Sequence, residues 1–168
     1  MDMKNFLFSL GTLLCVLCTG TVSAAPAPEP KYVDASTLTL VNKAHPTTQP
    51  FQRVEVADYP DLSKTVRRYY TYSTGVAVVF RTDSRSICAR WTTTDRQLST
   101  HMTGLSQKGM DLYIKRDGEW VFAGVARPGM GAEHKATIVD HMDGAEKECL
   151  LYLPLFDEVK TLEIGVDA

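Results

Sequence analysis

Ser84, which lies beside an aspartate, and four histidines are the side chains of this sequence best suited to hydrolytic chemistry. Ester hydrolysis by acyl transfer needs a nucleophile, a base that activates it and hydrogen-bond donors for the oxyanion. Ser84 ends the string Thr82-Asp83-Ser84. The histidines are scattered along the chain, at His45, His101, His134 and His141. Their spacing predicts no catalytic triad, although a triad assembled from separate strands stays open at this point.

The string Asp140-His141-x-Asp143 offers oxygen and nitrogen atoms of the kind that bind metal ions. No second cluster with a known ligand spacing accompanies it. Such a short polar string is more typical of a solvated turn, so we expect neither a metal nor a cofactor.

The N-terminus has the features of a secretory signal peptide at residues 1–24. Lys4 supplies the positive start, residues 6–17 are apolar but too few to span a bilayer, and Val22-Ser23-Ala24 is a small-residue cleavage site. We therefore expect a secreted or periplasmic protein that is cleaved near Ala24/Ala25 and keeps no transmembrane segment. The cleaved segment carries one base and one acid, so the net charge stays at −2, which gives no electrostatic case for nucleic acid binding.

Cys88 and Cys149 are the cysteines that remain after cleavage. Export permits a disulfide between them. Both lie inside predicted strands, however, where a disulfide needs adjacent and facing positions. Two buried free thiols are an equally good interpretation.

The elements that position these residues are predicted to be mostly strands. Residues 25–50 are rich in Pro, Ala and Thr, which indicates an extended leader with one short strand, and the domain is predicted at 51–168. Alternation with a period of two predicts strands at 37–41, 66–72, 75–81, 86–92, 109–115, 120–124, 134–139, 149–153 and 160–166. Short strands separated by Gly, Asp and Pro favour an all-β, jelly-roll-like β-sandwich.

Two β-hairpins are predicted within this sandwich. Strands 75–81 and 86–92 are expected to pair across Asp83-Ser84, and strands 109–115 and 120–124 across Asp117-Gly118. Trp91 and Trp120 are predicted to pack in the core rather than to present a platform to a sugar.

Asp111 and Tyr113 lie on the strand face opposite to the core residues of the second hairpin, Met110, Leu112 and Ile114. The simpler interpretation makes Tyr113 half-buried packing and lets Asp111 bond nearby backbone. Alternatively this face, together with Arg90 and His101, lines a junction with another domain or holds a sugar by stacking and hydrogen bonds.

Residues 150–156 are apolar at nearly every position, so both faces of this strand are predicted to be covered. One face belongs to the core. The other is expected beneath the loop 126–132 or, alternatively, forms a docking surface for another domain.

The string Gly109-x-Asp111-Leu112-Tyr113 resembles the signature of a domain that precedes the catalytic domain in secreted bacterial SGNH/GDSL-type esterases. Further blocks that carry the resemblance are Phe51-Gln52-Arg53, Val79-Phe80-Arg81-Thr82-Asp83-Ser84, Ile87-Cys88-Ala89-Arg90-Trp91, Leu151-Tyr152-Leu153-Pro154-Leu155 and Leu162-Glu163-Ile164-Gly165-Val166. The resemblance implies a sandwich of the galactose-binding-domain type that packs against an SGNH-type α/β domain, with Gly109, Asp111, Leu112 and Tyr113 in a structural role.

Esterases of this type place their nucleophile in a Gly-Asp-Ser block and its partners in an Asp-x-x-His block. Thr82-Asp83-Ser84 lacks the glycine, and no Asp-x-x-His occurs in the sequence. We therefore expect no catalytic residues and an accessory, non-catalytic domain. The alternatives are a free-standing, lectin-like carbohydrate-binding module and, less favoured, an esterase in its own right. Docking predicts an exposed apolar patch, whereas a lectin predicts a concave surface with projecting aromatics.

Overall fold

Strands are the predominant regular elements of residues 29–167, the part of the chain that the computed structural model describes. They are β1 (Lys31–Asp34), β2 (Thr39–Val41), β3 (Ala77–Thr82), β4 (Ile87–Thr92), β5 (Met110–Arg116), β6 (Glu119–Ala126), β7 (Glu133–Val139), β8 (Lys147–Tyr152) and β9 (Thr161–Val166). The helices are α1 (Lys64–Tyr70) and α2 (Gly104–Lys108), with short 3-10 turns at Ala35–Thr37 and Val56–Asp58. The predicted signal peptide lies outside the described residues.

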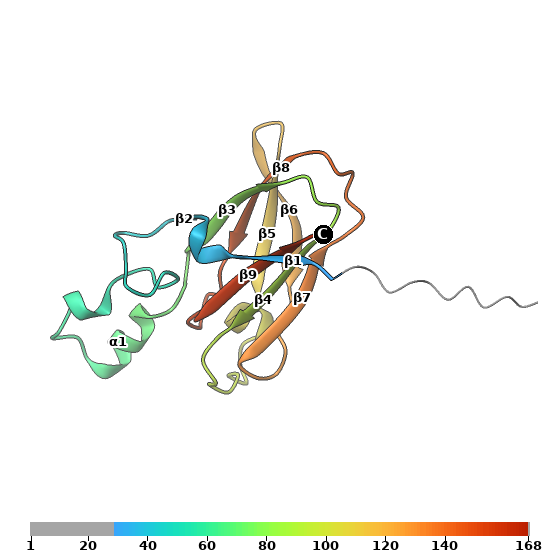
Figure 1. The fold of residues 1–168 in the computed structure, drawn as a ribbon. Helices are drawn as coiled ribbons and strands as arrows, with labels where there is room; N and C mark the ends of the chain where they lie inside the picture. Colours follow the sequence, from blue (N-terminus) through green and yellow to red (C-terminus); the bar gives the residue numbers. More distant parts are fainter. Residues whose placement is uncertain (1–28, 168) are drawn as a thin grey trace, which may run out of the picture.

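Two antiparallel sheets face one another, as Figure 1 shows. The four-stranded sheet has the order β1-β9-β4-β7, and the five-stranded sheet the order β2-β3-β8-β5-β6. The prediction of a mostly β fold built from paired sheets is confirmed, while the jelly-roll and galactose-binding assignment stays a prediction.

The strand predicted at 66–72 is instead helix α1, over Lys64–Tyr70. Val66, Tyr69 and Tyr70 favour a strand by propensity. Ser63 decides the local structure, because its hydroxyl accepts a hydrogen bond from the Val66 backbone N–H and caps the helix. Helix α2 was not predicted either, and Thr103 caps it in the same way.

The hairpin predicted between 75–81 and 86–92 is also wrong. Strand β3 pairs with β2 and β8, whereas β4 pairs with β7 and β9 in the other sheet. The segment 83–86 therefore carries the chain from one sheet to the other. The alternation of apolar and polar residues indicates that a segment is a strand, but it does not identify the strand that pairs with it. The pairing depends on how the two sheets pack against each other.

The sheets begin before Phe51, where the sequence places the start of the domain. Within the segment interpreted as a leader, β1 pairs with β9 and β2 pairs with β3. Ala35, in the 3-10 turn between these two strands, is fully buried. Residues 31–41 thus contribute one strand to each of the two sheets.

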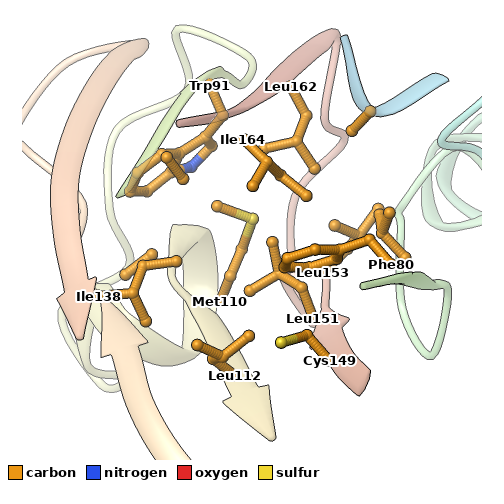
Figure 2. Close-up of a cluster of buried hydrophobic side chains, with 14 of the residues drawn as sticks. Phe80, Trp91, Met110, Leu112, Ile138, Cys149, Leu151, Leu153, Leu162 and Ile164 are labelled. Carbon is orange, nitrogen blue, oxygen red and sulfur yellow. The ribbon is translucent and has the colours of Figure 1, made fainter. Parts of the chain in front are cut away.

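The core lies between the sheets, as Figure 2 shows. Trp91, Leu162 and Ile164 enter it from the four-stranded sheet, and Met110, Leu112, Cys149 and Leu151 from the five-stranded sheet. The prediction that Trp91 and the alternating residues of β5 are core is confirmed. Trp120 is 38% exposed and lies on β6, so its predicted core position is wrong.

The long irregular segments of the chain gather at one end of the sandwich, which we call the loop end. The register places Thr92 opposite both Glu133 and Thr161, Met110 opposite Ala126, and Ala77 opposite Tyr152. The loop end consists of segments 42–76, 93–109, 127–132 and 153–160. Its largest segment carries α1 and lies apart from the two sheets in Figure 1. Among residues 29–167, neither helix has the length and apolar character needed to cross a membrane.

Candidate functional site

Gly109 of the motif occupies a position where a side chain does not fit. It follows α2, and its backbone N–H donates to the Leu105 carbonyl at 2.8 Å. A Cβ at this position would lie 2.4 Å from Leu105 Cδ1, 2.6 Å from the Leu105 carbonyl oxygen and 3.1 Å from the Ala126 carbonyl oxygen. The glycine therefore lets α2 pack closely against the end of β6, and this packing fixes the residue before it, Lys108.

Lys108 is the centre of a buried polar cluster, which we call the Lys108–Asp157 hub. Only 1% of Lys108 is exposed, and Asp157 is fully buried. The Lys108 ammonium donates to the carbonyls of Thr94 (2.8 Å) and Gly131 (3.1 Å) and lies 3.8 Å from Asp157 Oδ2. Asp157 Oδ1 accepts from the Thr94 hydroxyl at 2.7 Å and from the Glu158 N–H at 2.8 Å. The hub joins three of the four segments of the loop end.

Asp157 Oδ2 accepts no hydrogen bond within residues 29–167. It lies between the Lys108 ammonium and the Arg96 guanidinium, at 3.8 and 3.7 Å. Removing a carboxylate from water carries a large penalty that these two cations offset. The hub thus fixes the loop end through charge as well as through hydrogen bonds.

His134 extends this cluster at the start of β7. Its Nδ1 accepts a hydrogen bond from the Gly129 N–H at 3.1 Å, so the proton of the neutral ring lies on Nε2, which donates to the Thr93 hydroxyl at 3.0 Å. The ring lies beside Trp91, with 5.0 Å between centroids. Burial, and after it the charge of Lys108, lowers the pKa of His134, so the neutral ring is favoured. The imidazole holds the loop 127–132 in place.

Leu155 and Phe156 protrude from the loop end with 47% and 40% of their surface exposed. Their backbone is held firmly, since the Thr74 hydroxyl donates to the Leu155 carbonyl and the Arg96 guanidinium donates to the Phe156 carbonyl. The predicted cover of the 150–156 run is thus present only in part. Leu150 and Leu151 are buried, whereas the end of the run is open to solvent.

Helix α1 is linked to Phe156 through Tyr72 and Arg96. None of its residues is buried. The Arg68 guanidinium lies 5.1 Å from the centre of the Tyr69 ring, which meets Tyr72 edge-on at 5.5 Å. Tyr72 in turn accepts a hydrogen bond from Arg96. We name the exposed members of this set, Val66, Arg68, Tyr69, Leu155 and Phe156, the Arg–Tyr surface.

A second group of side chains lies on the outer side of the five-stranded sheet, and we call it the aromatic face. Its members are Tyr113, Trp120, Phe122 and Tyr152. Tyr113 meets Phe122 and Tyr152 edge-on, each at 5.8 Å, and the Lys115 ammonium lies 5.3 Å from the centre of the Trp120 ring. The prediction that Tyr113 is half-buried packing is confirmed.

Asp111 is exposed on the same outer face, in register with Tyr152. Its carboxylate forms no hydrogen bond or ion pair with any residue in the range 29–167, so the backbone contact expected from the sequence is not made. Leu112, by contrast, is fully buried in the core.

Arg90 and His101 do not join Asp111 and Tyr113 on one face. Arg90 lies on the outer side of the four-stranded sheet, where it donates two hydrogen bonds to Glu163 and stacks on Tyr32 at 4.1 Å. The contact with Arg90 lowers the pKa of the Glu163 carboxyl. His101 is exposed at the loop end. The sequence grouped these residues wrongly because neighbouring strands in the chain belong to different sheets.

The Ser84 hydroxyl is occupied by backbone groups. It donates to the Ser86 carbonyl and accepts from the backbone N–H groups of Asp167 (2.9 Å) and Ser86 (3.3 Å). Within the described chain, none of its hydrogen bonds involves a histidine. Ser84 therefore stabilises the crossing between the two sheets.

Cys88 and Cys149 are both free and buried, so the possible disulfide is not formed. Cys149 points into the core (Figure 2), whereas Cys88 contacts Thr137 on the other face of its own sheet. In the suggested metal string, Asp143 pairs with Lys147 at 2.5 Å and receives the Ala145 N–H. The described residues contain no group of three metal-binding side chains.

Sequence reasoning missed Lys108, Asp157 and Arg96. Two weak signals were present, because Lys108 directly precedes the motif glycine and Asp157 ends the apolar run 150–156. Neither signal shows that the two side chains meet, since they are far apart in the sequence.

A family model matches residues 30–168, and it is described as GxDLY, the N-terminus of esterases of the SGNH-hydrolase type. The chain belongs to this family. The GxDLY motif is thus Gly109-x-Asp111-Leu112-Tyr113, which supplies the tight packing of α2, one exposed carboxylate, one core residue and one residue of the aromatic face.

Two solved structures are similar to this GxDLY chain. A protein described as a GDSL-like lipase, from Bacteroides ovatus, is 48% identical with a TM-score of 0.79, and the match covers 82% of the GxDLY chain and 41% of that protein. The salicylyl-acyltransferase SsfX3 of a tetracycline biosynthetic pathway is 19% identical with a TM-score of 0.60, over 83% of the GxDLY chain and 40% of its own, which supports the fold alone. The GxDLY chain thus spans less than half of each. No curated protein matches it.

Proposed function

We propose that this GxDLY chain is a non-catalytic accessory domain that supports an SGNH-type catalytic domain acting on an ester. The observation that carries the proposal is the match to the Bacteroides ovatus lipase, in which the corresponding region makes up 41% of a longer chain. The occupied Ser84 hydroxyl and the engaged His134 ring support the non-catalytic part of the proposal, because both side chains are used to hold the scaffold together.

A chimera tests this function directly. The GxDLY chain replaces the matched region of the Bacteroides ovatus lipase, and hydrolysis of p-nitrophenyl acetate is measured for the lipase, the chimera and the GxDLY chain alone. We expect turnover by the first two and none by the third. The Ser84→Ala variant of the chimera keeps its turnover. Turnover by the GxDLY chain alone that Ser84→Ala abolishes would contradict the proposal.

A second candidate function is carbohydrate binding at the aromatic face, favoured by one observation. Phe122 is 57% exposed and lies next to Tyr113, with the unpaired Asp111 carboxylate on the same face. Exposed rings stack on sugars, and a carboxylate accepts hydrogen bonds from hydroxyl groups. The rings meet edge-on rather than in one plane, which makes this candidate the weaker of the two.

Affinity electrophoresis through gels that contain soluble xylan or cellulose derivatives tests the second candidate. Retardation that Phe122→Ala removes and Phe156→Ala leaves intact would establish it. If no gel retards the GxDLY chain, the carbohydrate-binding candidate is contradicted and the accessory role is the function that is left. We also propose export of the protein, and an N-terminus near Ala25 in protein recovered outside the cytoplasm would establish it.

A further inference from the structure

We infer that the Arg–Tyr surface is the site at which the catalytic domain docks. The inference rests on the proposed function and adds the location of the contact. The occupant is the apolar surface of an SGNH-type α/β domain. The part of the Bacteroides ovatus lipase beyond the match is larger than the matched part, so it is large enough to cover a whole end of the sandwich.

The types of side chain on this surface favour a protein over a sugar. Tyrosine, phenylalanine and arginine are enriched in the buried centres of protein interfaces. Here Arg68 contacts the exposed Tyr69, which is linked to Phe156 through Tyr72 and Arg96. Val66, Leu155 and Phe156 add exposed apolar side chains from the same two segments. Branched aliphatic groups gain from burial against apolar protein atoms but offer no flat surface for a sugar ring.

Helix α1 lacks the packing that usually stabilises a helix. It has seven residues, fewer than an isolated helix needs for stability in water, and none of them is buried. Its side chains meet Tyr59 and Tyr72 by ring edges, Tyr70 lies beside the Arg53 guanidinium, and Arg67 donates a hydrogen bond to the Pro60 carbonyl. These contacts leave Val66 and Tyr69 exposed. A partner that covers Val66 and Tyr69 would supply the missing burial.

The backbone beneath the exposed apolar side chains is already fixed. Asp157, the residue after Phe156, is locked in the hub, and Arg96 holds the Phe156 carbonyl while it pairs with Asp157. Little conformational entropy is then lost when a partner binds. The two most exposed rings of the aromatic face, Trp120 and Phe122, lie instead on β6, an edge strand of the five-stranded sheet, and no residue next to them belongs to the hub.

The experiment uses the chimera and the GxDLY chain alone, with amide hydrogen exchange as the readout. We expect exchange at 64–70 and 155–157 to slow at least about tenfold in the chimera relative to the GxDLY chain. Phe156→Asp, and separately Tyr69→Asp, should remove this protection in the chimera. The matched control is Phe122→Asp, which places the same charge on an exposed phenylalanine of the aromatic face and should leave the protection intact.

Thermal unfolding of the three variants in the isolated GxDLY chain shows whether each still folds, and both Phe156→Asp and Phe122→Asp should unfold within a few degrees of the wild type. Protection that appears at 113–122 instead of 64–70 would overturn the docking site. An active chimera without protection at 64–70 overturns the docking site alone. An inactive chimera with that protection overturns the proposed function alone.

Discussion

Gly109 and Lys108 are adjacent in the sequence and act together. The glycine is required for space rather than for backbone conformation, because its φ is −83°, an ordinary value for any residue. What it permits is the approach of α2 to the Ala126 carbonyl, which brings the Lys108 ammonium into the hub. Trp91 reinforces this position by donating its indole N–H to the Lys108 carbonyl at 2.9 Å.

Gly109→Ala should lower the free energy of unfolding by about 1–3 kcal/mol, since the new methyl group overlaps the Leu105 carbonyl and forces α2 to shift. Chemical denaturation measures the change. Gly131→Ala is the matched control, because a Cβ there meets no atom within 4 Å, and we expect a change within about 0.5 kcal/mol. Equal effects of the two substitutions would contradict the steric role of Gly109.

Lys108→Met should be more damaging, by about 3–5 kcal/mol, because it leaves the buried Asp157 carboxylate with only Arg96, whose side chain is partly exposed to solvent, as a cation. The double variant Lys108→Met/Asp157→Asn removes both charges and should recover part of the loss. Lys115→Met breaks a partly exposed contact with Glu148 and serves as the control, with an expected loss below about 1 kcal/mol. Urea denaturation of all three variants decides between these outcomes.

At the scale of elements, the turn of the β5–β6 hairpin sets which side chains face outward. Asp117 and Gly118 have φ of 51° and 87°, as a two-residue type I′ turn requires. This turn pairs Arg116 with Glu119 and therefore Lys115 with Trp120. Because Lys115 points outward, so does Trp120. The turn type, read together with the alternation, was sufficient to predict an exposed tryptophan.

The opposite orientations of Cys88 and Cys149 predict how the two thiols react. Burial raises the pKa of Cys149 to about 11, so its reactive thiolate is scarce near pH 8. In the folded protein iodoacetamide should leave Cys149 unmodified, and in denaturant without reductant it should modify both cysteines. Peptide mapping by mass spectrometry locates the modifications. A disulfide-linked peptide pair would contradict the described placement.

At the scale of the whole molecule, the sandwich has one end with short connections and one end where the long segments meet. The hub and His134 join the segments 93–109, 127–132 and 153–160 at that loop end. A change of charge in this cluster therefore acts on several segments at once. Protonation of His134 is the change that pH can produce.

The stability of the protein should fall as the pH decreases through the range just below 6.5. The pKa of His134 is lowered in the folded state, so the unfolded chain binds more protons in this range. The neutral imidazole makes its full contribution to the free energy of unfolding at pH values above the histidine pKa of the unfolded chain, near 6.5. This contribution is lost as the pH falls below that pKa. In His134→Gln the dependence should be weaker. Urea denaturation of both proteins between about pH 5 and 8 measures it, and a difference between them that does not vary with pH would contradict the prediction.

The strands were predictable because apolar and polar residues alternate along them. The Lys108–Asp157 hub was not predictable from the sequence. Met110, Leu112 and Ile114 indicate a core-facing strand by themselves, and the sequence located β5 correctly. The contact between Lys108 and Asp157 depends on α2, on the end of β8 and on the order of strands in two sheets. Strand β3 pairs with β8 rather than with β4 because of the way the two sheets pack around the core. The local sequence pattern of these strands does not predict that pairing.

The pairing of β1 with β9 has a consequence for synthesis on the ribosome. Strand β1 is the first strand of the described chain, and its sheet partner is the last. A nascent chain therefore exposes the unpaired edge of β1 and β4 until Thr161–Val166 has left the exit tunnel. During that interval we expect the polypeptide to depend on holding chaperones, and release before that point should yield aggregates rather than a smaller folded unit.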